Sequence, residues 1–237
     1  MKEITQQFFS QNKESLYFYP LYSCLDFTYT NSVFSMIYLE LPMKNVLVIK
    51  SSILANNSQS SQLVDYLKSK ITANITEYDF GANPLPYYNL DAAAGTRGEP
   101  KTEAQQKALE LSNQLIGEVN NSDVLVFGVP MYNLGIPAQL KTYIDYLNRA
   151  GVTFRYTANG PEGLITGKKA IVILAHGGIY KDSPTDLAKL YMQTVLNFIG
   201  ITEVEFVYAE GIGYGPEAVE KAQQSAKAEL DRIAASF

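Results

Sequence analysis

The chain has 237 residues, 46% of them hydrophobic, and its 19 Lys and Arg against 24 Asp and Glu give a formal net charge of −5 and a pI near 5.0. That length and composition suffice for one α/β domain with an appendage, while the acidic balance gives no electrostatic reason to expect nucleic acid or a membrane as partner. A single cysteine, Cys24, and a single histidine, His176, exclude an internal disulfide and metal sites built from several cysteines or histidines, so we predict no metal. These features suit a reduced, cytoplasmic protein.

Residues 1–42 differ in character from the rest of the chain. Segment 16–41 is rich in Tyr and Phe but has neither strand alternation nor a helical period. Its longest apolar stretch, Val33–Leu39, is too short for a membrane helix, and the segment does not fit a signal peptide. We expect residues 1–42 to be an upstream over-call of the start codon, with a genuine, disordered extension as the alternative, and residues 43–237 to be the functional domain.

From Met43 onward, apolar strands alternate with amphipathic helices. The first half predicts a strand at Val46–Ile49, a loop at Ser51–Ser58, a helix with Leu63, Tyr66, Leu67 and Ile71 on one face, a short strand at Ile75–Phe80 and an irregular stretch at Gly81–Lys101. Thr102 and Gln105 have the spacing of a capping box, and we expect a helix behind them through Val119.

The second half continues the alternation. It predicts strands at Val124–Val129, Ala170–Ala175 and Val204–Tyr208, and helices after Pro137, at Thr185–Ile199 and at Pro216–Phe237. Continuous apolar strands alternating with helices indicate a parallel sheet covered on both faces. Five strands and five helices predict a flavodoxin-like, doubly wound α/β fold, in which ligands bind beyond the carboxyl ends of the strands.

The loop after the first strand, Ser51–Ser60, lacks glycine, so it is neither a Walker A loop nor a dinucleotide fingerprint. It offers the hydroxyls of Ser52, Ser58 and Ser60 and the amide of Gln59 at the start of a helix. Such groups bind a phosphate without a lysine. The alternative is that these serines only cap the helix.

The loop after Val129 contains Met131, Tyr132, Asn133 and Leu134. Met131 and Tyr132 can present a polarizable and an aromatic surface, and Asn133 carries both a donor and an acceptor, as the edge of a flavin pyrimidine ring requires. An ordinary strand-to-helix turn would have the same residue types.

The loop after the third apolar strand contains Ala175, His176, Gly177 and Gly178. Two adjacent glycines let backbone N–H groups approach a planar ligand closely. His176 could titrate near neutral pH, but we interpret it as a wall residue or hydrogen-bond donor, because a flavin accepts hydride without an imidazole. The later Gly211–Pro216 stretch has its third glycine one position too early for a dinucleotide fingerprint, so we interpret it as a turn that could line the site.

Several stretches match a known family in its own order. They include Val46–Leu54, Ser58–Ser60, Val129–Asn133, Arg149–Thr157, Asn159–Gly163, Gly177–Ile179, Pro184–Leu187, Phe198–Ile201 and Ala209–Gly211. On these motifs the chain from Met43 resembles the bacterial FMN-dependent NADH-azoreductases, within the wider NAD(P)H dehydrogenase (quinone) group.

The resemblance implies a cofactor, a partner and a reaction. FMN phosphate would be held by Ser52, Ser58, Gln59 and Ser60, and the isoalloxazine would rest against residues 131–134 and the backbone of residues 175–178. The protein would be a homodimer with active sites at the subunit interface, where Tyr156 and Phe198 help form the substrate pocket. NADH would reduce FMN and leave, and a quinone or azo compound would then take the electrons in the same place. No side chain would be catalytic, because FMN carries the chemistry.

Three residues depart from the family pattern. Leu134 stands where relatives often have Phe, and Ala175-His176 replaces a Ser-Arg pair, which removes a fixed cation near the flavin. These departures leave open a non-catalytic flavodoxin-like protein, which would not bind flavin. A flavodoxin-type electron carrier, which would not oxidise NADH directly, is a second alternative.

Overall fold

The computed structural model describes residues 43–237, so the expectation for residues 1–42 lies outside the described residues. The described chain forms a five-stranded parallel sheet in the order β2-β1-β3-β6-β7, built from β1 (Asn45–Lys50), β2 (Asn74–Asp79), β3 (Val124–Pro130), β6 (Lys169–Ala175) and β7 (Glu203–Ala209). In chain order this is 2-1-3-4-5, the flavodoxin-like arrangement, and the predicted fold class is confirmed.

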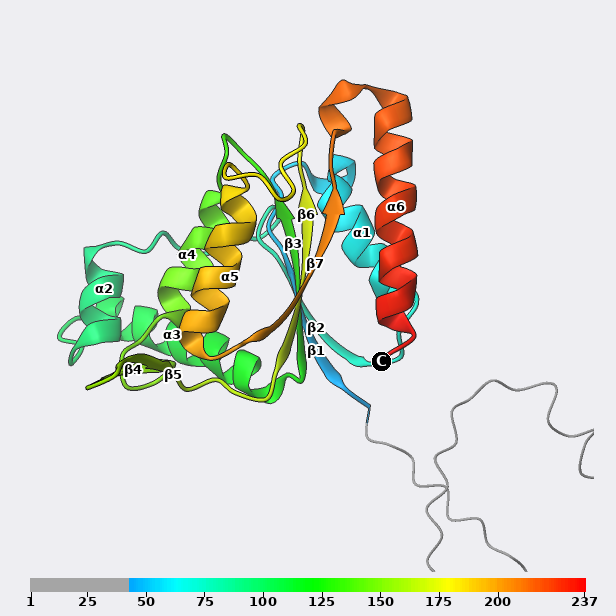
Figure 1. Cartoon of the computed structure of the whole chain (residues 1–237). Helices are drawn as coiled ribbons and strands as arrows, with labels where there is room; N and C mark the ends of the chain where they lie inside the picture. Colours follow the sequence, from blue (N-terminus) through cyan, green and yellow to red (C-terminus); the bar gives the residue numbers. More distant parts are fainter. Residues whose placement is uncertain (1–42) are drawn as a thin grey trace, which may run out of the picture. The chain divides into compact units, whose positions relative to one another are not determined.

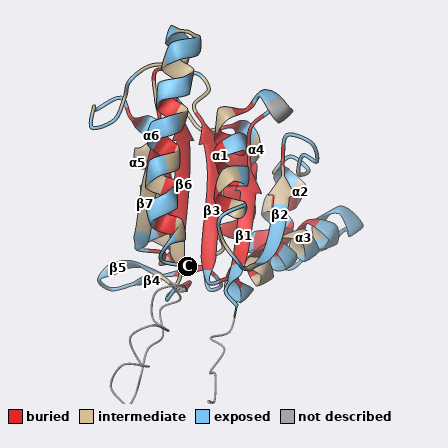
Figure 2. Cartoon of the chain, turned by 90° about the vertical axis from the view of Figure 1, so that its right-hand side faces the viewer, coloured by how far each residue is buried: buried red, intermediate tan, exposed pale blue. Residues whose placement is uncertain are grey.

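Helices cover both faces of the sheet (Figure 1). α1 (Gln59–Lys68) and α6 (Pro216–Ala234) lie on one face, and α3 (Glu103–Asn121), α4 (Ala138–Leu147) and α5 (Leu187–Ile199) lie on the other. Side chains of β1 alternate between the two cores: Val46 and Val48 pack with α1 and α6, whereas Leu47 and Ile49 pack with α3 and α4. Consequently β3 is buried along its whole length, and β6 is buried after its first residue (Figure 2).

One helix was not predicted. The stretch Gly81–Lys101, expected to be irregular, contains α2 (Leu90–Arg97). Asn89 caps this helix by accepting a 3.0 Å hydrogen bond from Ala92 N–H. α2 packs closely on α3, because a Cβ on Gly95 would lie 2.2 Å from the carbonyl oxygen of Gln105. Small residues with no apolar period form this helix, so periodicity alone could not reveal it.

A two-stranded antiparallel hairpin, β4 (Phe154–Thr157) with β5 (Gly160–Gly163), was also not predicted. It lies at the end of the sheet where the parallel strands begin (Figures 1 and 2). Two short 3₁₀ turns complete the described chain, η1 (Ala55–Asn57) and η2 (Ile212–Tyr214). Within residues 43–237 no helix is long and apolar enough to cross a membrane.

The remaining predicted elements are present, with small shifts at their ends. Thr102 caps α3 as expected, accepting from Gln105 N–H at 3.2 Å, but the Gln105 side chain accepts from Lys101 N–H and not from Thr102. The expected start of the helix at Thr185 moves to Leu187, because the Asp186 side chain caps α5. The last helix ends at Ala234 and not at Phe237.

Candidate active site

The three loops selected from the sequence meet at one edge of the sheet. β1, β3 and β6 are adjacent and parallel, so the loops that follow them emerge side by side at the carboxyl edge (Figure 1). Two hydrogen bonds join neighbouring loops and strands there: Ser51 Oγ donates to Gly128 O at 2.7 Å, and Met131 N–H donates to Ala175 O at 2.9 Å.

The first loop presents buried hydroxyls at the start of α1. Ser58 is the N-cap residue, and its Oγ accepts a 3.1 Å hydrogen bond from Ser61 N–H. Ser58 Oγ also lies 3.2 Å from Ser60 Oγ, and both residues are buried. The first turn of a helix leaves N–H groups free for an anion, so capping and anion binding are compatible here. The Gln59 side chain points elsewhere, because Gln223 of α6 donates to its Oε1 at 2.8 Å.

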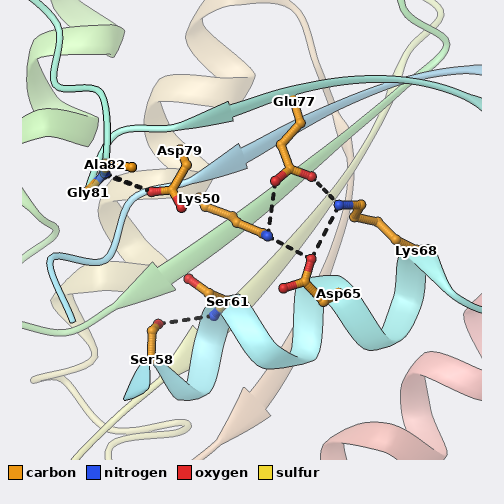
Figure 3. A network of polar contacts seen from close by, with 9 residues as sticks. All are labelled: Lys50, Ser58, Ser61, Asp65, Lys68, Glu77, Asp79, Gly81 and Ala82. Carbon is orange, nitrogen blue, oxygen red and sulfur yellow. Dashed lines mark hydrogen bonds and ion pairs between the residues drawn. The ribbon is translucent and has the colours of Figure 1, made fainter. Parts of the chain in front are cut away.

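A network of charged side chains holds the end of β1, from which this loop starts (Figure 3). The ammonium of Lys50, the last residue of β1, lies 2.6 Å from Asp65 Oδ1 on α1 and 3.0 Å from Glu77 Oε1 on β2. Lys68 pairs with both carboxylates. Burial opposes charge on Lys50, but the hydrogen bonds to Asp65 and Glu77 outweigh it, so the pKa of Lys50 is raised.

The same network acts on the acid of β2. Burial would raise the pKa of Glu77, yet hydrogen bonds from Lys68 and Lys50 lower it below its ordinary value. β1, β2 and α1 are therefore held together by complementary charges on the three elements that surround the loop.

The second loop makes a strained tight turn. Tyr132 and Gly135 exchange two 3.0 Å backbone hydrogen bonds, and the central residues Asn133 and Leu134 have φ of 50° and 67°. Asparagine tolerates this left-handed conformation, whereas leucine does not favour it. The turn leaves Leu134 46% exposed. Tyr132 joins the turn to the first loop, because its hydroxyl is 2.8 Å from Ser52 Oγ.

The third loop lies against the segment after β7. Its His176, Gly177 and Gly178 carbonyls accept hydrogen bonds of 3.2, 2.9 and 2.9 Å from backbone N–H groups of residues 211–213. A Cβ on Gly213 would lie 3.0 Å from Gly177 O, whereas a Cβ on Gly177 would meet no atom within 4 Å. The Gly211–Pro216 stretch is thus a turn that backs this loop, and Gly177 faces open space.

Comparisons with known proteins agree with this geometry. The family model for the flavodoxin-like fold matches residues 44–234. A protein of Haemophilus influenzae strain 86-028NP, named FMN-dependent NADH:quinone oxidoreductase, is 54% identical over 196 residues, covering 82% of this chain and 100% of that protein. The chain belongs to this family of FMN-dependent NADH:quinone oxidoreductases.

Other members and neighbours are similar. An FMN-dependent NADH:quinone oxidoreductase of Escherichia coli O139:H28 is 55% identical over 201 residues, again with 82% of this chain and 100% of that protein covered. The crystal structure of an azoreductase from Bacillus anthracis strain Sterne is 34% identical, with a TM-score of 0.74 and coverage of 82% of this chain and 100% of that one. The predicted family is confirmed.

Two residues predicted for the substrate pocket of this oxidoreductase lie away from the three loops. Tyr156 is on β4 and Phe198 is in the last turn of α5, at the opposite end of the sheet (Figure 1). Phe154 joins them, with its ring centroid 5.5 Å from that of Tyr156 and 4.3 Å from that of Phe198. The chain therefore does not bring these two aromatics to its own cofactor loops.

One residue at the candidate site had no role in the sequence prediction. Glu210, directly after β7, accepts hydrogen bonds at Oε1 from Tyr180 N–H at 2.6 Å and Lys181 N–H at 2.8 Å. His176 Nδ1 lies 3.3 Å from the same oxygen. An acidic residue immediately after a strand, at the edge where ligands bind, is the signal that could have identified it.

Proposed function

We propose that this chain is an FMN-dependent NADH:quinone oxidoreductase that also reduces azo compounds. The observation that carries the proposal is the convergence of three loops, typical in order and sequence of the family, on the carboxyl edge of a flavodoxin-like sheet. NADH is the donor, and quinones and azo compounds are the acceptors.

The first loop fits the phosphate of FMN. The start of α1 supplies N–H groups and a helix dipole, and Ser52, Ser58 and Ser60 supply buried hydroxyls. Lys50 is engaged by Asp65 and Glu77, so the phosphate is bound by neutral donors. Gln59 contributes through its main chain, since its side chain bonds to Gln223.

The second and third loops fit the flavin ring. Met131, Tyr132, Asn133 and Leu134 provide one wall, and the backbone of residues 175–178 provides the other. The open space beside Gly177 supports this assignment, because a side chain there would occupy the position of the ring.

FMN supplies hydride acceptance and delivery when it is bound. The chain binds and orients it, and backbone N–H groups near Asn133 and Gly177-Gly178 favour negative charge at the ring edge. Ala175 and His176 contribute their backbone to one wall of the site, and no side chain acts as a catalytic acid or base.

We further propose that the protein is a homodimer in which each subunit completes the other's substrate pocket. Tyr156 and Phe198 can reach a flavin only on a second chain, because β4 and the last turn of α5, which carry them, lie at the far end of their own sheet. The outer face of α5 supports an interface, with Leu187 and Leu190 44% and 61% exposed. We place the enzyme in the cytoplasm, where NADH is available.

Steady-state kinetics of the purified protein tests the function. We expect one FMN per chain, NADH oxidation that depends on benzoquinone, and parallel double-reciprocal plots for the two substrates, as a shared site demands. Bound flavin without NADH oxidation would indicate an electron carrier, and lack of flavin binding would indicate a non-catalytic relative.

A further inference from the structure

The third loop is held by one carboxylate that has no part in the function proposed above. Glu210 Oε1 receives the N–H groups of Tyr180 and Lys181 at 2.6 and 2.8 Å, and it lies 3.3 Å from His176 Nδ1. Its donors lie at both ends of the loop, residues 176–181. The Glu210 side chain is only 14% exposed, so water competes little for these bonds, and hydrogen bonds to a charged acceptor are stronger than neutral ones.

This contact favours the tautomer of His176 that carries its proton on Nδ1. A carboxylate can only accept, so a neutral imidazole with Nδ1 beside Glu210 has its proton on Nδ1. Nε2 is then an acceptor, and it is buried without a hydrogen-bond partner among residues 43–237. The rings of Tyr180 and Tyr208 flank the imidazole, with centroids 5.7 and 5.8 Å away.

Backbone hydrogen bonds to β7 and the segment after it hold only the first half of the loop, where His176 N–H also donates to Ala209 O at 2.9 Å. Residues 211–213 bind the carbonyls of His176, Gly177 and Gly178, whereas the segment that follows, Tyr180 and Lys181, is joined to β7 through the Glu210 side chain. Two adjacent glycines give the loop many unfolded conformations, so ordering it costs free energy that a bound ligand would otherwise supply.

We propose that Glu210 is a positioning residue of this oxidoreductase: it holds the loop of residues 176–181 in its binding geometry before FMN arrives and fixes His176 as the Nδ1–H tautomer. The proposal rests on the proposed function only where it concerns FMN. Glu210 itself need not touch the cofactor, because its effect passes through Tyr180, Lys181 and His176.

The test compares three variants with the wild-type protein. Glu210→Ala removes the acceptor, Glu210→Gln keeps an oxygen that can accept both backbone N–H groups, and Glu203→Ala changes an exposed acid at the other end of the same strand. FMN dissociation constants are measured by quenching of flavin fluorescence. We expect Glu210→Ala to bind FMN about tenfold more weakly, since the loop loses its hydrogen bonds to a charged acceptor, and both other variants to stay within about threefold of wild type.

A second measurement does not depend on FMN. His176 is the only histidine, so ¹⁵N-histidine labelling of untagged protein gives imidazole signals that need no assignment and distinguish the two tautomers. We expect the Nδ1–H tautomer in wild type and in Glu203→Ala, and its loss in Glu210→Ala.

Several outcomes would overturn the proposal. Wild type with the proton on Nε2 contradicts the contact, whether or not any variant folds. FMN binding by Glu210→Ala within twofold of wild type contradicts positioning, and a tenfold loss in Glu210→Gln contradicts the role of the accepting oxygen. Failure of the wild-type protein to bind FMN would instead contradict the proposed function, and the tautomer would still test the contact.

Discussion

Leu134 occupies a backbone conformation that its side chain disfavours. Its φ of 67° lies in the left-handed region, as does that of Asn133, and the two residues form the centre of the Tyr132–Gly135 turn. For a leucine this costs on the order of 1 kcal/mol. Since such strain clusters at functional sites, it supports a role for the half-exposed Leu134 side chain at the proposed flavin site.

Replacing Leu134 with Asn tests the strain at this residue. We expect Leu134→Asn to raise the free energy of unfolding by about 0.5–1 kcal/mol, because asparagine tolerates positive φ and little apolar surface is lost. Urea denaturation measures the change in the free energy of unfolding. A variant less stable than wild type would show that the turn is not strained at this position.

Individual site residues could be predicted from the sequence where their role depends on neighbouring residues in the chain. Ser58 has the position of a helix cap, and the paired glycines mark a close backbone approach, so both could be identified without a structure. The side chains of Gln59 and Glu210 could not be interpreted in this way. Their partners, Gln223 and residues 180–181, are joined to them only by the tertiary fold.

At the scale of elements, the first loop is confined by the strand ends around it. A Cβ on Gly81, just after β2, would lie 2.0 Å from the carbonyl oxygen of Ser52. Gly81 N–H is itself held by Asp79 Oδ1 at 2.9 Å (Figure 3). The segment after β2 therefore limits where the loop after β1, the proposed phosphate loop, can lie.

Substituting this glycine should displace the loop. We expect Gly81→Ala to weaken FMN binding at least about tenfold and to lower the unfolding free energy by roughly 1–3 kcal/mol, because backbone must move to admit the methyl group. Gly117→Ala, in α3 with no atom within 4 Å of the added Cβ, is the matched control and should stabilise by up to about 1 kcal/mol. Equal FMN affinity in Gly81→Ala and wild type would contradict the close approach.

The charge network of β1, β2 and α1 predicts a pH dependence. The raised pKa of Lys50 means that its contribution is present below its unfolded value and is lost as pH rises through the folded value. The lowered pKa of Glu77 means that its contribution is present above its unfolded value, 4.5, and is lost as pH falls through the folded value.

Lys50→Met should therefore destabilise most between these limits. We expect the free energy of unfolding to fall by about 1–2 kcal/mol at neutral pH, because the Lys50 side chain is only 10% exposed. Its removal leaves the carboxylates of Asp65 and Glu77 with Lys68 as their shared partner. The difference from wild type, measured by urea unfolding, should shrink below pH 4.5. Lys107→Met breaks a pair that is 71% and 82% exposed, so it should cost less than about 0.5 kcal/mol; equal losses in both variants would contradict the burial argument.

The strands and most helices could be predicted because their apolar residues form either continuous runs or repeats at helical spacing. β3 and β6 are continuous apolar runs, and α3 repeats its apolar residues at helical spacing. α2 and the β4–β5 hairpin lack such patterns. α2 depends on the close approach of Gly95 to α3, and Gly163 of β5 lies so near Gly200 that a Cβ would be 2.1 Å from its nitrogen, so tertiary packing defines both.

At the scale of the whole described domain, the proposed cofactor loops and the proposed pocket aromatics, Tyr156 and Phe198, occupy opposite ends of one sheet. A homodimer resolves this separation if the end that carries Tyr156 and Phe198 in one subunit faces the loops of the other. Tyr156 is 75% exposed on the single chain, as expected for an aromatic side chain that a second subunit would cover.

The proposed homodimer predicts complementation between subunits. Tyr156→Ala should retain FMN and raise the Michaelis constant for benzoquinone by about fivefold to tenfold, as expected for loss of one aromatic contact. Co-expressing it with Ser60→Asp, which should repel the FMN phosphate, should give mixed dimers with one complete site and a wild-type Michaelis constant. Mixed dimers no better than Tyr156→Ala alone would place Tyr156 outside the partner's pocket.

The most direct test of the central claim is anaerobic stopped-flow mixing of the FMN-loaded protein with NADH, followed by benzoquinone. The account predicts rapid bleaching of the visible flavin band by NADH in the absence of any acceptor, and full recovery of the band when benzoquinone is added. Bound flavin that NADH cannot bleach, or that benzoquinone cannot reoxidise, would contradict an NADH:quinone oxidoreductase.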